Sequence, residues 1–411
     1  MGKNEQKPAI RFQGFTDAWE QRKVGEVSKR VIVGLATSVT PYYREEGVPI
    51  LRNLNIKENY LDDTDILFLD RPYAESQVSK QIHAGDVLTV HTGYIGISCV
   101  VPEKYDNCLT FTTLITTTDD AVLEGAFLAQ YLNSEIGMSA VQAVTTQGGR
   151  QNLNTNDFVK VEIRYPSLAE QSKICAVLSR IDNLITLHQR KYDQLVNIKK
   201  SMLEKMFPRD GASVPEIRFS GFTDPWEQRK LSDLAEIVGG GTPDTNNSAY
   251  WDGDIDWYAP AEMEGQRYAK GSVRKITELG LQKSSAKILP AHRTVLFTSR
   301  AGIGKMAILQ RSAATNQGFQ SLVLKDGTDP YFIYSMGEKI KDMAEGVASG
   351  STFLEISGKM LGNLEVMVPN LKEQKSIATF FRSIDDLITL HQRKLEKLKN
   401  IKKSMLEKMF V

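Results

Sequence analysis

The sequence is poor in the residues that mark secreted, membrane-spanning and metal-binding proteins. Its 411 residues include 3 cysteines and 5 histidines. Cys99, Cys108 and Cys175 are odd in number and lack CxxC spacing, which argues against a disulfide framework and against a zinc site. No apolar run reaches the roughly 18 residues of a membrane helix, and the polar start lacks the apolar core of a secretory signal. We therefore expect a soluble, cytoplasmic protein that holds no metal.

Charge of one sign is not in excess either. There are 51 Lys and Arg residues against 50 Asp and Glu residues, a net charge of +1. This balance excludes a protein that coats nucleic acid through charge alone. Apolar residues make up 41% and charged residues 25% of the chain, which is typical of globular proteins. A chain of this length is expected to form two or three domains.

The motifs of common catalytic sites are also absent. The nearest approach to a phosphate-binding P-loop ends in Gly304-Lys305, and it lacks the first glycine and the final hydroxyl residue. The glycine run 239–241 leads into Thr242-Pro243, which is a turn and not the helix start that a dinucleotide site requires. The histidines form no HExxH pattern. We predict no catalytic residue in this chain.

What the sequence does contain is a duplication. Residues 168–207 and 371–410 are identical at 26 of 40 positions, at an offset of 203. Residues 10–23 and 217–230 are identical at 12 of 14 positions, at an offset of 207. The chain therefore consists of two similar half-chains, each with a similar beginning, a divergent middle and a near-identical tail.

The divergent middles share one pattern. Residues 85–101 align with residues 293–309 at an offset of 208, which places Gly96 on Gly304. Both stretches read as a strand, a glycine-containing turn and a second strand. Elsewhere the middles are rich in Thr, Val, Ile and Tyr between Gly and Pro residues, which indicates short strands with a few helices, for example over 124–141. Each middle is predicted to be a mixed α/β domain.

The two tails are predicted to be long helices. Neither contains Pro or Gly, and steps of four and three residues pick out ten positions from Ile174 to Met206, eight of them apolar. The second tail has the same pattern from Ile377 to Met409. A helix of this length spans roughly 60 Å. Because a lone helix cannot bury such a stripe, we expect the tails to pack as an antiparallel coiled coil.

Two features of the tails leave their role open. His188 and His391 occupy equivalent positions on the seam. They are either a ligand or switch pair, or, as we favour, a polar interruption that fixes the helix register. The tails together carry a net charge of +8, and the rest of the chain a net charge of −7. The basic helix surface is either solvated, or it docks an acidic partner or lies near DNA phosphates.

The duplication predicts the domain organisation. The fold class is α+β, with two similar mixed α/β domains related by a pseudo-twofold repeat. We expect a first domain over 1–167, a helix over 168–207, a linker over 208–216 that contains Pro and Gly, a second domain over 217–370, and a helix over 371–411.

Two divergent domains separated by stiff helices suit a target with two different elements at a fixed distance. Duplex DNA is the commonest target of this kind, since equivalent faces of its major groove recur every ~34–36 Å along the axis. In that case each domain reads one element and the helices set the gap between the two elements.

Short stretches of the sequence resemble one family in their order. The second half-chain contains GFTDPWEQRKLSDL, GGGTPDTNNSAYWDGDIDWYAPAEM, SSAKILP, SRAGIGKMAI, ATNQGFQSL and ASGSTFLEI. The first contains GFTDAWEQRKVGEV, VPILRNLNI, AGDVLTVHTGYIG and TQGGRQNLNTNDF, and PSLAEQ and PNLKEQ lead into the tails. This set, present twice, resembles the DNA specificity subunit of type I restriction-modification systems over nearly the whole chain.

The resemblance implies a non-catalytic subunit. Two target recognition domains each bind one half of a bipartite, asymmetric sequence in double-stranded DNA. The paired helices separate the domains and help to dock two methyltransferase subunits, which bind S-adenosylmethionine and methylate adenine. Restriction subunits that use ATP and Mg²⁺ complete the nuclease. This chain itself is expected to bind no cofactor.

Candidate DNA-binding residues lie on polar turns and loops of both middles. The aligned turn offers His91, Thr92 and Tyr94 in the first domain and Ser299, Arg300 and Lys305 in the second. Arginine can donate two hydrogen bonds to one guanine, whereas lysine more often contacts a phosphate. The further candidates, on loops or after predicted strands, are Arg52, Asn53, Gln147, Arg150, Asn152, Arg267, Ser351 and Thr352. Trp19, Trp226, Trp251 and Trp257 are expected to be structural.

Two other functions remain as alternatives. One is a single-chain restriction or methylation enzyme, which the missing catalytic motifs disfavour. The other is a protein scaffold that uses the helices and reads no DNA. A scaffold has no need of divergent domains that carry Arg150 and Arg300 on equivalent loops.

Overall fold

The computed structural model describes residues 7–145, 152–209, 211–300, 302–349 and 354–411. Among the candidate residues, Gln147, Arg150, Ser351 and Thr352 lie outside the described residues.

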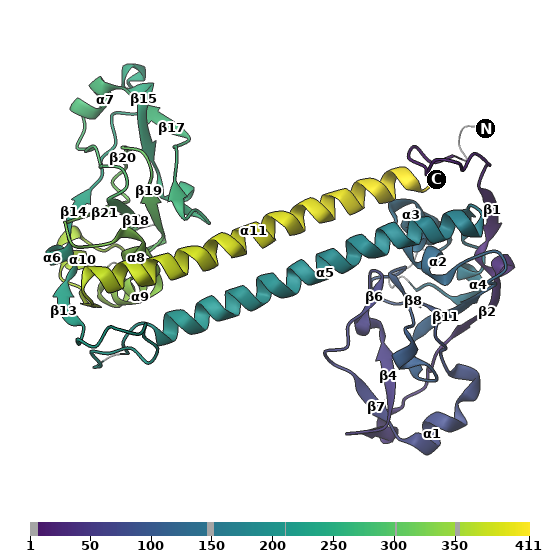
Figure 1. Ribbon diagram of the computed structural model, residues 1–411. Helices are drawn as coiled ribbons and strands as arrows, with labels where there is room; N and C mark the ends of the chain where they lie inside the picture. The colour runs from purple at the N-terminus through teal and green to yellow at the C-terminus, as the bar shows by residue number, and fades with distance from the viewer. Residues whose placement is uncertain (1–6, 146–151, 210, 301, 350–353) are drawn as a thin grey trace. The chain divides into compact units, whose positions relative to one another are not determined.

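The chain divides into two compact units (Figure 1). The first comprises residues 1–190 and 392–411, and the second comprises residues 191–391. Each unit contains one mixed α/β domain, the start of one long helix and the end of the other. Each long helix is shared between the two units.

The first domain is built on a four-stranded antiparallel sheet in the order β2-β11-β8-β9. A second sheet has the order β10-β4-β7-β3, and two two-stranded ribbons pair β1 with β12 and β5 with β6. The strands are β1 Glu20–Lys23, β2 Ser28–Val33, β3 Tyr43–Arg44, β4 Val48–Arg52, β5 Ile56–Lys57, β6 Tyr60–Leu61, β7 Leu67–Leu69, β8 Val87–Val90, β9 Ser98–Val100, β10 Leu109–Phe111, β11 Thr113–Thr118 and β12 Glu162–Tyr165. The helices are α1 Arg71–Ser76, α2 Gly125–Leu132, α3 Glu135–Val144 and α4 Thr155–Phe158.

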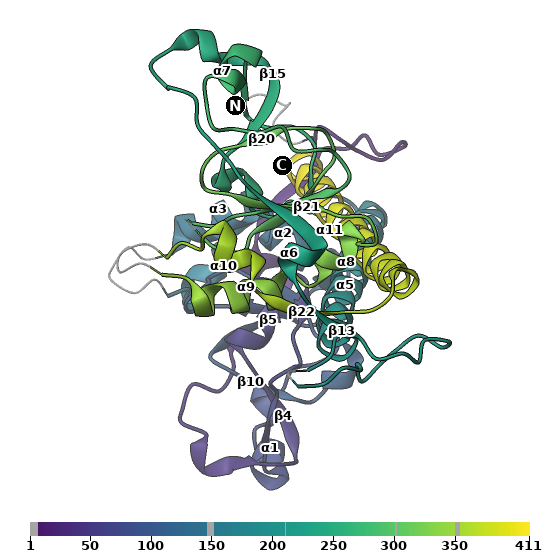
Figure 2. The same ribbon diagram turned by 90° about the vertical axis from the view of Figure 1, so that its left-hand side faces the viewer.

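The second domain repeats this plan with a five-stranded sheet in the order β14-β21-β18-β19-β16. A smaller sheet has the order β17-β15-β20, and β13 pairs with β22 as β1 pairs with β12. Figure 2 shows α7 next to β15, at the end of the domain away from α9 and α10. The strands are β13 Glu227–Lys230, β14 Ala235–Gly239, β15 Trp251–Tyr258, β16 Tyr268–Ala269, β17 Arg274–Ile276, β18 Thr294–Phe297, β19 Met306–Leu309, β20 Ala314–Thr315, β21 Gln320–Leu324 and β22 Glu365–Val368. The helices are α6 Leu231–Leu234, α7 Glu278–Gln282, α8 Pro330–Ser335, α9 Gly337–Val347 and α10 Gly358–Gly362.

The helical stretch predicted over 124–141 consists of two helices. The chain forms α2 and α3 with a break at Asn133-Ser134. The Ser134 hydroxyl accepts a hydrogen bond from the backbone N–H of Gly137 at 3.1 Å and so begins a new helix. The Asn133 side chain meanwhile donates to the backbone carbonyl of Ser98 on β9. An Asn-Ser pair inside a helical pattern was the available signal for this break.

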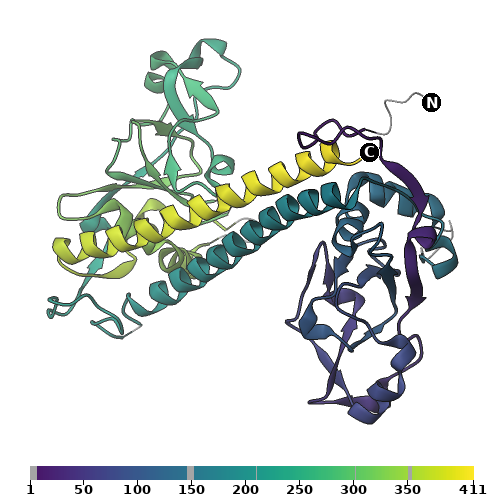
Figure 3. The ribbon, with the colours of Figure 1, turned by 45° about the vertical axis from the view of Figure 1, so that its right-hand side comes forward.

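The two long helices are confirmed as α5 Leu168–Lys205 and α11 Leu371–Met409. In the first unit the start of α5 lies beside the end of α11, where Asp182 and Lys402 form an ion pair of 2.6 Å (Figure 3). In the second unit the pair is Asp385 and Lys199, at 2.7 Å. These pairs are equivalent under the 203-residue repeat, and in each unit they hold the helices in an antiparallel arrangement.

Each domain core is completed by the end of the long helix that comes from the other half-chain. Phe410 packs against Trp19, Phe127 and Tyr131, with ring centroids 5.5–6.1 Å apart. The equivalent Phe207 packs in the second unit against Trp226, Phe332 and Phe381. The predicted structural role of Trp19 and Trp226 is confirmed, since both are buried. Trp251 and Trp257 are buried as well.

In each half-chain a buried ion pair joins the repeated initial segment to the first turn of α5 or α11. Arg11 donates two hydrogen bonds of 2.7 Å to the Glu170 carboxylate. Arg218 does the same to Glu373. Both glutamates are about 1% exposed, so the bidentate geometry satisfies carboxylates that are out of contact with water.

Within the described ranges, no helix combines the length and apolar character that crossing a membrane requires. The three cysteines are free and buried.

Candidate nucleic-acid interface

The predicted strand–turn–strand is confirmed in the first domain as β8, the turn 91–97 and β9. The backbone N–H of Gly96 donates to the Val90 carbonyl at 2.9 Å and closes the turn. Gly96 has a φ of 92°, which favours glycine. A Cβ atom at this position would lie 2.8 Å from Met138 Sδ on α3, so the turn rests directly on that helix.

The second domain closes the aligned turn between β18 and β19 with an equivalent hydrogen bond. The Gly304 N–H donates to the Thr298 carbonyl at 2.9 Å, and Gly304 has a φ of 87°. A Cβ atom here would lie 2.4 Å from Lys341 Cγ on α9. Met138 and Lys341 are 203 residues apart, the offset that also relates the two tails. We call these two turns, residues 91–97 and 299–305, the paired hairpin tips.

The chain returns to each hairpin tip after the helix that supports it. In the first domain the N–H of Leu153 donates to the His91 carbonyl at 2.9 Å, and Thr92 forms a β-bridge with Asn152. In the second domain the N–H of Ile356 donates to the Ser299 carbonyl at 3.1 Å. The structure therefore brings together segments that are about 60 residues apart.

Several described candidate residues of the first domain lie at or near its hairpin tip. Thr92 and Asn152 are exposed, and Tyr94 is 85% exposed. The Asn53 Oδ1 accepts from the Thr113 hydroxyl at 3.1 Å. Thr113 pairs with Val90 at the end of β8, which places Asn53 close to the tip. A set of exposed hydroxyl and amide groups of this kind can read base edges.

Arg52 and His91 are less exposed to solvent than Thr92, Tyr94 and Asn152. Arg52 is partly buried and forms a 2.8 Å ion pair with Asp65. Burial lowers the pKa of the His91 ring below its ordinary value, so the ring is neutral at pH 7 and offers a hydrogen bond rather than a charge. Its Nε2 atom is buried and has no hydrogen-bond partner within the described residues.

The described candidate residues of the second domain lie in three environments. Arg300 at the tip is partly buried, while Ser299 beside it is fully buried. Lys305 Nζ lies 3.2 Å from the Glu264 carboxylate. Arg267 faces α11, where it forms an ion pair of 2.5 Å with Asp386. Arg267 therefore fastens the domain to the helix in this structure, and Arg300 is the most available guanidinium at the tip.

Sequence reasoning missed two polar residues beside the second hairpin tip, Thr242 and Gln317. The N–H of Ser299 donates to the Gly318 carbonyl at 2.8 Å, which places the turn 316–318 against the tip. The Thr242 hydroxyl hydrogen-bonds the exposed Gln317 side chain. The available signal was the glycine run 239–241: a Cβ atom on Gly240 would lie 2.0 Å from the Asn316 carbonyl oxygen.

The long helices carry a second candidate surface. Three apolar side chains at equivalent positions of the two units are each between 39% and 47% exposed. Each stands one position before a seam residue, which places all three on one side of an antiparallel pair. We call them the helix patches: Leu184, Leu187 and Ile401 in the first unit, and Leu387, Leu390 and Ile198 in the second. The two patches are equivalent under the 203-residue repeat.

Comparisons with known proteins agree with this duplicated arrangement. A family model described as the type I restriction modification DNA specificity domain matches residues 16–197 and 223–400. The type I restriction enzyme MjaIX specificity subunit of Methanocaldococcus jannaschii is 36% identical over 195 residues, which are 45% of this chain and 44% of that protein. The putative MjaX specificity subunit of the same organism is 23% identical over 406 residues, 94% of this chain and 92% of that protein.

A solved structure has the same fold. The S subunit of a type I restriction-modification system from M. genitalium matches with a TM-score of 0.64 at 14% identity, over 98% of this chain and 99% of that one. The family model covers most of both half-chains, with one domain in each. The chain therefore belongs to the family of type I restriction-modification DNA specificity subunits.

Proposed function

We propose that the chain is the non-catalytic specificity subunit of a type I restriction-modification complex, and that each domain reads one half of a bipartite, asymmetric target in double-stranded DNA. The observation that carries this proposal is the paired hairpin tips. Two turns that are closed by aligned glycines, each resting on a helix, present Thr92 and Tyr94 in one domain and Arg300 in the other. A common frame with different side chains suits a target whose halves differ in sequence.

The residues of the second tip support different roles in DNA binding. Arg300 forms no ion pair with any described residue, and its forked donors match the O6 and N7 atoms of guanine. Lys305 is paired with Glu264, so contact with a phosphate requires this exposed pair to open. Opening costs little, since exposed ion pairs contribute only about 0–1 kcal/mol.

The long helices are proposed to set the gap between the two half-sites. Their antiparallel register is fixed in each unit by one ion pair, Asp182–Lys402 or Asp385–Lys199. A displaced register would separate these charges and remove the packing of Phe410 and Phe207 from the domain cores.

The helix patches are proposed to dock two methyltransferase subunits. Exposed leucine and isoleucine side chains on a helix surface favour a covering partner, and two equivalent patches favour two copies of the same partner. In this proposal S-adenosylmethionine binds to the methyltransferase subunits, restriction subunits bring ATP and Mg²⁺, and this chain binds no cofactor.

Adenine methylation mapping of host DNA tests the proposal. The full chain is co-expressed with its cognate methyltransferase subunit, and the control is the methyltransferase subunit alone. A two-part motif with a fixed gap that depends on the chain is the expected result. A stable complex that methylates no such motif contradicts DNA reading and supports the scaffold alternative.

A further inference from the structure

Hydrogen bonding to bases does not explain why the aromatic ring of Tyr94 is exposed to solvent. This side chain stands at the first hairpin tip and is 85% exposed. It makes no ring contact with another aromatic side chain of the described residues. A tyrosine ring offers a large area for packing, so a tyrosine presented to water at this site favours a partner that covers the ring.

The backbone that carries the ring is held by its turn and by the core beneath it. Gly93 and Gly96 have φ values of 86° and 92°, and the N–H of Ile95 donates to the Gly93 carbonyl at 3.0 Å. Ile95 packs against the buried core beneath the tip, and Gly96 rests on Met138. The ring is therefore presented by a preorganised turn, which reduces the entropy lost on binding.

The groups around the ring suit a nucleobase partner better than a protein core. Thr92 and Asn152 beside it are exposed hydroxyl and amide groups, and Asn53 lies close to the same tip. These groups hydrogen-bond base edges while an aromatic ring stacks on the base faces.

The second hairpin tip lacks this ring. The 208-residue offset places Gly302 at the position of Tyr94, and Gly302 has a φ of 99° in the aligned turn. Tyr94 has no positive φ, so the two turns differ in backbone conformation at this position, and among the described residues only the first tip presents an aromatic side chain.

We propose that Tyr94 is a wedge that stacks into the base pairs of the first half-site and partly unstacks one step. Aromatic and apolar side chains unstack base steps in this way, most easily at pyrimidine–purine steps. The first domain then reads its half-site partly through the deformability of that step, and the second domain does not. This inference rests on the proposed function.

The test uses the complex of the full chain with its methyltransferase subunits, bound to duplexes that contain the mapped target. The fluorescent base 2-aminopurine replaces single bases of the first half-site. The adenine that becomes methylated is left unlabelled, because extrusion of that base would itself raise the fluorescence.

The wild-type complex should raise the fluorescence at one step of the first half-site and at no step of the second. Tyr94→Ala should return that signal to the level of free duplex and weaken binding about tenfold or more. Tyr94→Phe should retain both, because stacking does not need the hydroxyl. Since Tyr94 is exposed, both variants are expected to fold.

Two results would overturn the wedge and leave the proposed function intact. One is a wild-type complex that binds its target specifically with no fluorescence rise in the first half-site. The other is a Tyr94→Ala complex with unchanged fluorescence and affinity. A wild-type complex that prefers no DNA sequence overturns both the proposed function and the wedge.

Discussion

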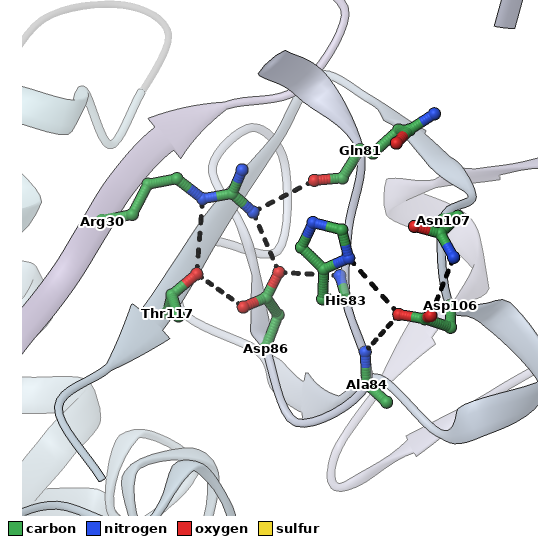
Figure 4. A network of polar contacts seen from close by, with 8 residues as sticks. All are labelled: Arg30, Gln81, His83, Ala84, Asp86, Asp106, Asn107 and Thr117. Atoms are coloured by element: carbon green, nitrogen blue, oxygen red, sulfur yellow. Dashed lines mark hydrogen bonds and ion pairs between the residues drawn. The ribbon is translucent and has the colours of Figure 1, made fainter. Parts of the chain in front are cut away.

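At the residue scale, the two domains share a frame but not the polar groups that stabilise it. Figure 4 shows a network around Asp86 that belongs to the first domain. Asp86 accepts hydrogen bonds from Arg30 at 3.0 Å, Thr117 at 2.6 Å and the backbone N–H of His83 at 2.9 Å. The equivalent position in the second domain is Thr294, whose hydroxyl donates to the Pro290 carbonyl.

Asp86→Ala should destabilise the first unit by about 3 kcal/mol, because it leaves the partly buried Arg30 without its buried partner. Urea unfolding of the full chain measures the change. The matched control is Asp120→Ala, which removes an exposed ion pair with Lys29 and should cost less than about 1 kcal/mol. Equal losses in the two variants would show that burial does not decide the strength of this network.

The sequence predicted residues in repeated positions well and residues with distant partners poorly. The two hairpin tips and the buried Trp19 and Trp226 followed from alignment of the half-chains. Arg267 pairs with Asp386, which is 119 residues away, and no local sequence pattern predicts this contact. The full burial of Ser299 likewise depends on how the turn 316–318 packs against it.

At the element scale, the heptad pattern of the tails predicts some features of the long helices and not others. The pattern predicted one continuous helix for each tail, which is confirmed. It predicted the seam but not the register, because many registers bury a regular stripe equally well. The register is set by the ion pairs Asp182–Lys402 and Asp385–Lys199, and the 203-residue repeat contains both.

Exchanging the charges of Asp182 and Lys402 tests whether their ion pair sets the register of the helices. Lys402→Glu places a second negative charge beside Asp182, in a site where both side chains are less than a quarter exposed. We expect a loss of roughly 2–4 kcal/mol in the free energy of unfolding, and recovery of more than half of it in the double variant with Asp182→Lys. Lys403→Glu alters an exposed pair with Glu135 and serves as the control. Additive single effects would refute the pairing.

Deletion of one heptad from both long helices, at matching heights, tests their role as a spacer. Seven residues shorten a helix by roughly 10 Å, which corresponds to about three base pairs at 3.4 Å each. Methylation mapping should return the same two half-sites with a shorter gap. An unchanged gap would contradict the spacer role, whereas altered half-sites would show that the deletion disturbs the domains.

At the scale of the whole molecule, the chain is organised so that each domain core needs both half-chains. Phe410 completes the core around Trp19, and Phe207 completes the core around Trp226. The sequence identified the near-identical tail ends but could not predict this exchange, since identical ends fit either core. Only packing in three dimensions distinguishes the two.

Phe410→Ala should therefore destabilise the first unit, and Phe207→Ala the second, each by about 3–5 kcal/mol as for other buried phenylalanines. Hydrogen exchange followed by mass spectrometry measures the loss of protection peptide by peptide. The two variants are controls for each other. Loss of protection in the unit that keeps its phenylalanine would contradict the assignment of the chain ends.

The most direct test of the central claim, that each domain reads its own half of the target, is to compare methylation motifs of two variants, one from each domain. Arg300→Ala removes the guanidinium at the second tip, and Asn152→Ala removes an exposed amide at the first. Each contact is worth about 1–3 kcal/mol of base discrimination, so each variant should relax one half of the motif and leave the other half and the gap unchanged. If both variants relax the same half, or neither alters the motif, the claim is wrong.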